Sequence, residues 1–183
     1  MNRATQLRLR LRFLTWIIIF GLVVSGATAV PVEWELKQLA RWLEIADARA
    51  SDQLPGFAGW VLRVWIGVRE TDASFPFLSY GTDWLAFGHF VIAIAFIGAL
   101  RDPARNRWLF QFGMIACVLV IPWAFLMGHI RDIPVGWRLI DCSFGVLGFI
   151  PMWLAHRAAG ELEGLQNGSR ENSTARPQPT GRR

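Results

Sequence analysis

Six polar side chains between residues 80 and 141 could together form one site: Tyr80, Asp83, His89, His129, Arg138 and Asp141. They lie at or near the ends of long apolar segments. Ionisable groups at the edge of a membrane, or inside it, are costly, so they usually face neighbouring helices and find partners there. Arg138 and Asp141 are three residues apart, so they would share a helix face and could form an ion pair.

The two histidines of this set could bind a metal ion or a haem iron, because imidazole is a common ligand. Neither His89 nor His129 has a second histidine three or four residues away. His89 would also lie about one turn deeper in its helix than His129. We therefore expect no bound metal or cofactor, and a haem held by these histidines is the alternative.

Other chemistry is less well supported by the residue types. A proton or solute path would need polar groups along the whole length of the helices, and their far halves offer only Gln111 and His156. A catalytic group made of His129, Asp141 and Cys142 matches no known nucleophile arrangement. The remaining interpretation is structural: charged residues at the helix ends form ion pairs that lock a short turn.

Four long apolar segments must position these residues, and they cover 13–30, 83–100, 108–128 and 138–156. A helix that crosses a hydrocarbon core of about 30 Å needs roughly 20 mostly apolar residues, with about 17 as the lower limit. Inside a bilayer the backbone must satisfy its own hydrogen bonds, so such segments form helices. The sequence predicts an all-α membrane protein with four transmembrane helices.

The first segment has an alternative interpretation. A basic start, an apolar stretch and the small residues Ala27, Thr28 and Ala29 are also typical of a secretory signal peptide with its cleavage site. Against this, the hydrophobic character continues through Val30 and Val32, and the arginine-rich lead is long for a signal peptide. We expect an uncleaved transmembrane helix.

The distribution of basic residues predicts the orientation. Twelve of the 19 basic residues fall in the N-terminal tail 1–12, the loop 101–107 and the C-terminal tail 157–183. Loops rich in Lys and Arg stay on the cytoplasmic side. Both termini should therefore be cytoplasmic, with 31–82 and 129–137 on the periplasmic side. The formal charge of +5 does not indicate nucleic-acid binding, because the basic residues flank apolar segments instead of forming one basic face.

The region 31–82 should contain two amphipathic helices. Leu36, Leu39 and Leu43 recur at helical spacing, and after a break a second pattern includes Trp60 and Val64. We expect these helices to lie at the membrane surface or to cap the bundle. The tail 157–183, which becomes rich in Asn, Ser, Pro and Arg, should be disordered.

Several stretches resemble those of an uncharacterised family of small bacterial four-helix inner-membrane proteins. They are YGTDWLAF at 80–87, LRDP at 100–103, FGMIAC at 112–117 and WRLIDCSFG at 137–145. The resemblance implies a location in the bacterial cytoplasmic membrane. It implies no activity and assigns no catalytic residue.

We expect a non-enzymatic membrane component with an accessory, assembly or scaffold role. The alternative is a transporter, or a protein that binds a ligand or cofactor, with the six polar residues forming an outward-facing pocket. The principal partner should be the lipid bilayer, with another membrane protein or a second copy of the chain as a further partner, and no nucleic acid.

Overall fold

The computed structural model describes residues 2–47 and 54–174, with side chains up to residue 169. These residues form helices and contain no strand, which confirms the all-α prediction. In chain order the elements are α1 (Arg3–Thr28), α2 (Val32–Trp42), α3 (Gly56–Ser74), the short 3-10 helix η2 (Pro76–Leu78), α4 (Tyr80–Arg101), α5 (Arg107–Ile130) and α6 (Val135–Thr174).

Four of the described helices, α1, α4, α5 and α6, are long and apolar enough to cross a membrane. No more than a third of the residues in the apolar window of each helix is buried inside the molecule. Monomeric soluble proteins rarely expose continuous apolar surface on this scale, because water disfavours it. The prediction of four helices suited to a membrane is confirmed, and the surface they expose is suited to lipid.

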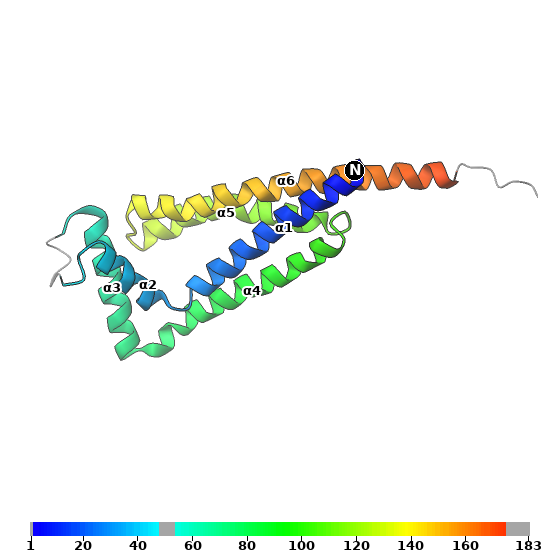
Figure 1. The fold of residues 1–183 in the computed structure, drawn as a ribbon. Helices are drawn as coiled ribbons and strands as arrows, with labels where there is room; N and C mark the ends of the chain where they lie inside the picture. Colours follow the sequence, from blue (N-terminus) through cyan, green and yellow to red (C-terminus); the bar gives the residue numbers. More distant parts are fainter. Residues whose placement is uncertain (1, 48–53, 175–183) are drawn as a thin grey trace, which may run out of the picture.

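The four long helices associate as two pairs, α1 with α4 and α5 with α6 (Figure 1). Glycine allows the close approach in each pair. A Cβ atom on Gly26 would lie 3.0 Å from the carbonyl oxygen of Ala86, and one on Gly145 would lie 2.5 Å from that of Cys117. Helix backbones in membranes commonly approach at small residues, because contact there replaces lipid with close packing. Each pair is therefore a tightly packed unit.

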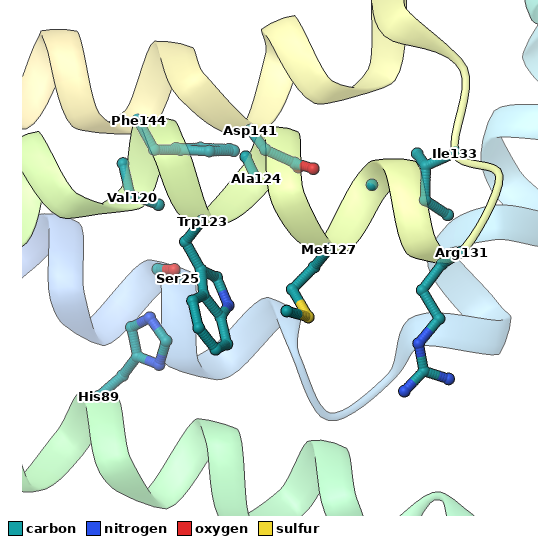
Figure 2. Close-up of a pocket in the computed structure, with 11 residues that line it drawn as sticks. Ser25, His89, Val120, Trp123, Ala124, Met127, Arg131, Ile133, Asp141 and Phe144 are labelled. Carbon is teal, nitrogen blue, oxygen red and sulfur yellow. The ribbon is translucent and has the colours of Figure 1, made fainter.

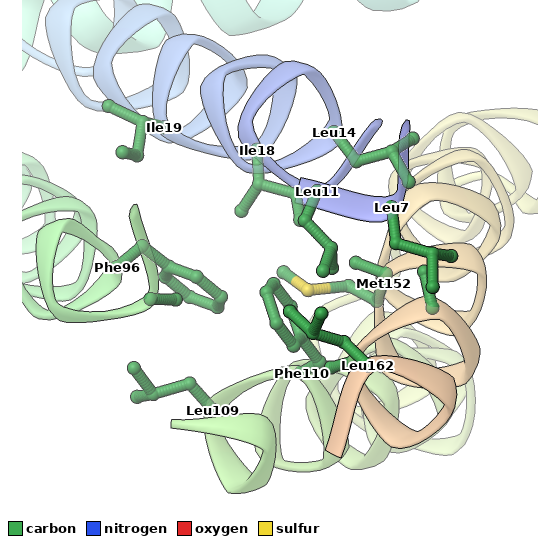
Figure 3. Close-up of a cluster of buried hydrophobic side chains, with 14 of the residues drawn as sticks. Leu7, Leu11, Leu14, Ile18, Ile19, Phe96, Leu109, Phe110, Met152 and Leu162 are labelled. Atoms are coloured by element: carbon green, nitrogen blue, oxygen red, sulfur yellow. The ribbon is translucent and has the colours of Figure 1, made fainter. Parts of the chain in front are cut away.

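The two pairs meet in a hydrophobic core at the end of the bundle that carries the N-terminus, which we call the core end (Figure 3). Each helix contributes a side chain that is at most 1% exposed: Leu11, Phe96, Phe110 and Leu162. The rings of Phe96 and Phe110 lie 5.9 Å apart between centroids. Toward the opposite end, which we call the open end, the two pairs diverge (Figure 1).

Helices α2 and α3 lie at the open end and pack against each other (Figure 1). Their apolar faces form a second small core that includes Ala40, Val61 and Trp65. The ring of Phe57 stacks on that of Trp137, with centroids 5.8 Å apart, which links α3 to the start of α6. The two helices predicted between the first and second spanning segments are present, and their placement at a membrane surface stays a prediction.

The expected disorder of 157–183 is wrong for 157–174, which continue α6. The reason is that the apolar stripe of α6 does not stop at the edge of the spanning segment. Ala158, Ala159 and Leu162 are buried in the core shared with α1, and Arg3 forms an ion pair of 2.7 Å with Glu161. The basic tail 1–12 is likewise helical from Arg3 onward, so the two predicted tails pack on each other. Residues 175–183 lie outside the described residues.

Candidate functional site

A cleft of about 420 Å³ separates the two helix pairs toward the open end (Figure 2). Helices α1 and α4 contribute Ser25 and His89. The opposite wall comes from α5, the turn that follows it and α6, which supply Val120, Trp123, Ala124, Met127, Gly128, Arg131, Ile133, Asp141 and Phe144. The cleft exists because the hydrophobic core joins the pairs at the core end, so their separation grows with distance from that core.

His89 forms the polar part of the α4 wall. Its ring Nδ1 lies 2.8 Å from the carbonyl oxygen of Leu85, one turn earlier in the same helix. A carbonyl oxygen only accepts hydrogen bonds, so Nδ1 carries the proton and Nε2 of the neutral ring is left as an acceptor. A Cβ on Gly26 of α1 would lie 3.0 Å from the Cβ of His89, so the α1–α4 contact fixes the histidine backbone.

Asp141 forms the polar part of the α6 wall, on the opposite side of the cleft from His89 (Figure 2). Its side chain is half-buried. Among the residues that the structure describes, no hydrogen bond or ion pair satisfies its carboxylate. A carboxylate that is withdrawn from water without a partner is costly, so this group is available to a hydrogen-bond donor or a cation that enters the cleft.

The remaining lining is mainly apolar. The indole of Trp123 extends from α5 toward His89, and the thioether of Met127 lies between Trp123 and Arg131 (Figure 2). Trp123 is 62% exposed, so neighbouring side chains leave much of the residue uncovered. Cavities that bind small molecules typically combine such an apolar lining with a few polar groups that fix orientation.

Arg138 does not form an ion pair with Asp141, although their spacing along the helix would allow one. Its Nε donates a hydrogen bond of 2.7 Å to the carbonyl oxygen of Ile133. The aliphatic part of the side chain packs on Gly128, where an added Cβ would lie 2.6 Å from the Cδ of Arg138. The turn between α5 and α6 is closed by this bond and by the backbone N–H of Ile133, which donates to the carbonyl of Gly128 over 2.8 Å. Between residues 128 and 141, all of which are described, no ion pair locks the turn.

The other three predicted site residues lie outside the cleft. Tyr80 and Asp83 line a separate shallow depression of about 220 Å³ with Trp84 and Phe87. His129 is exposed near the end of α5 and does not line the cleft with His89. In residues 2–47 and 54–169 no three His, Cys, Asp or Glu side chains cluster as metal ligands would. Of the six predicted residues, the structure brings His89 and Asp141 together.

The prediction missed Ser25, Trp123 and Met127 as cleft residues. Trp123 and Met127 are four residues apart, so they share a face of α5, which is a signal that the sequence does contain. Nothing in the sequence distinguishes that face from the faces that meet lipid, because all of them are apolar. Ser25 precedes Gly26, at which α1 approaches α4, so the small-residue pattern of α1 could have pointed to it.

Comparison of the chain with protein-family models, with curated proteins and with solved structures found no match.

Proposed function

We propose that this chain is a non-enzymatic, multi-pass membrane protein that binds an amphipathic molecule in the cleft between its helix pairs. The ligand has an apolar body and a head group, such as a hydroxyl or an amine, that donates a hydrogen bond. In this proposal the protein lies in a bacterial cytoplasmic membrane with both termini in the cytoplasm. The charge distribution and the sequence resemblance support that location and orientation.

The observation that carries the proposal is the pair of unsatisfied polar groups facing one apolar cleft. The carboxylate of Asp141 has no partner among the described residues, and Nε2 of His89 remains an acceptor. Polar groups inside a membrane are expensive and usually mark a binding site or a pathway. A ligand with two N–H or O–H donors could satisfy both acceptors, and a single hydroxyl would satisfy one of them.

Binding is better supported than conduction. The core end is filled by large side chains from all four helices, including Leu11, Phe96 and Phe110. These side chains close the cleft on that side and bring no polar group that could continue a path. A cleft that is open on one side and sealed on the other suits retention of a ligand, in keeping with an accessory role.

The test is photo-crosslinking of the full chain in liposomes with a long-chain alcohol that carries a diazirine in its tail. We expect crosslinks in the cleft wall that contains Trp123 and Met127. Replacing Asp141→Asn together with His89→Ala should lower the labelling of that wall about tenfold, because the negative charge of the carboxylate and the imidazole acceptor are both lost.

The matched control is Asp83→Asn, which removes a carboxylate from the same end of the bundle but outside the cleft. It should leave labelling by the alcohol unchanged. An alkane probe without a hydroxyl should label the double variant and the parent chain equally. Equal labelling by the alcohol in the parent chain and in the double variant would contradict ligand binding. An accessory role that depends on helices α2 and α3 alone would then explain the function of the chain better.

A further inference from the structure

The core end carries a cluster of arginines that the cleft does not involve. Arg8 and Arg12 are four residues apart on α1, so they share one helix face, and Arg101 is the last residue of α4. All three line one pocket of about 210 Å³, together with Asp102, Leu162 and Gln166. A neighbouring pocket shares Arg8, Asp102 and Gln166 with it, so the basic region is continuous.

These arginines differ from Arg3 and Arg107 at the same end because no carboxylate among the described residues lies within ion-pair distance of them. Arg3 forms an ion pair with Glu161, and Arg107 forms one with Glu163 over 3.5 Å. Within the part of the chain that the structure describes, no ion pair involves Arg8, Arg12 or Arg101. Three guanidinium groups around one small pocket repel one another unless an anion lies between them.

The only acidic group in this pocket neutralises one of the three charges. Asp102 also accepts a hydrogen bond of 3.2 Å from the backbone N–H of Arg105, so its carboxylate is already engaged. The lining therefore has a formal charge of about +2, with guanidinium groups that can bind oxygen atoms in a bidentate manner. This charge and geometry match a phosphate group.

We propose that Arg8, Arg12 and Arg101 form a binding site for a phosphate ester at the core end of the bundle. The pocket lies where the apolar segments of α1 and α4 give way to charged residues, and Leu100 and Leu162 form part of its wall. A phospholipid could therefore place its phosphate among the arginines and its acyl chains along the helices. A soluble phosphate compound would use the same guanidinium groups.

The experiment measures binding to the full chain in a zwitterionic detergent, with dihexanoyl phosphatidylglycerol, dihexanoyl phosphatidylcholine and glycerol 3-phosphate as separate probes. We expect phosphatidylglycerol to bind at least about tenfold more tightly than phosphatidylcholine, and Arg8→Gln, Arg12→Gln or Arg101→Gln each to weaken it about tenfold. If glycerol 3-phosphate binds with the same arginine dependence, the natural ligand is a soluble phosphate. If it does not bind, the ligand is a lipid.

Arg10→Gln is the matched control, because Arg10 lies on the same helix and carries the same charge but lines neither pocket. It should change the affinity less than twofold. The proposal is overturned if both lipids bind equally, if the three pocket variants bind phosphatidylglycerol like the parent chain, or if Arg10→Gln weakens binding as much as they do. Unchanged thermal unfolding of each variant excludes a general loss of structure as the cause.

Discussion

The side chain of Arg138 ties the start of α6 to the turn before it. Its Nε donates to the carbonyl oxygen of Ile133 over 2.7 Å, and its aliphatic carbons cover the backbone of Gly128. A positively charged donor strengthens such a bond, and the Arg138 side chain is only half exposed, so water competes weakly for it.

We therefore predict that Arg138→Ala lowers the free energy of unfolding by about 1–2 kcal/mol, since a charge-assisted hydrogen bond and its packing are lost together. Arg131→Ala, seven residues earlier, removes an exposed guanidinium at the edge of the cleft and should cost less than about 0.5 kcal/mol. Thermal or denaturant unfolding in the same detergent measures both. Equal losses in the two variants would show that the bond to Ile133 does not stabilise the turn.

Residue types alone identified the polar groups of the open end, but not which of them converge. His89 and Asp141 were predicted because both are ionisable and lie within apolar segments, near their ends. Tyr80, Asp83 and His129 satisfy the same criteria and lie elsewhere, because the two helix pairs diverge at this end. The angle between the pairs depends on packing at the core end, about which these polar residues carry no information.

At the scale of elements, Gly145 determines how closely α6 can approach α5. A Cβ at this position would lie 2.5 Å from the carbonyl oxygen of Cys117, which belongs to the backbone and cannot rotate away. Gly164 lies in the same helix and has nothing within 4 Å of an added Cβ. The two glycines thus separate the effect of close packing from that of helix propensity.

Gly145→Ala should lower the free energy of unfolding by about 1–3 kcal/mol, because the helices must separate to accept the methyl group. Gly164→Ala should be neutral or stabilising by up to about 1 kcal/mol, since alanine favours a helix over glycine. Unfolding of each variant in detergent tests the pair. Tolerance of alanine at position 145 would contradict the close contact between α5 and α6.

The helices could be predicted more completely than their ends. Apolar segments that are long enough to cross a bilayer form helices there, so the number and order of the four long helices could be predicted from the sequence. The continuation of α6 was not predicted because most residues after Gly160 are polar. Its apolar stripe is short and includes Ala158, Ala159 and Leu162, which pack in the core shared with α1. That stripe is recognisable only once the basic tail is known to be a helix that can cover it.

At the scale of the whole molecule, two helix pairs are held together at one end and separate at the other. The two proposed sites therefore lie at opposite ends of the bundle and differ in the chemistry of their lining. The apolar cleft with His89 and Asp141 belongs to the open end, and the arginine pocket belongs to the core end. If both termini are cytoplasmic, the arginine pocket faces the cytoplasmic leaflet and the cleft faces the opposite one.

Insertion of the four long helices, with the core end in the cytoplasm, is the premise on which both sites depend. Thiol labelling of intact cells with a membrane-impermeant maleimide tests it directly, in a chain whose Cys117 and Cys142 are replaced by serine. A single cysteine at Pro134, in the turn between α5 and α6, should react in intact cells. Single cysteines at Arg105 and Ser169 should react only after lysis, and their labelling in intact cells would contradict the account.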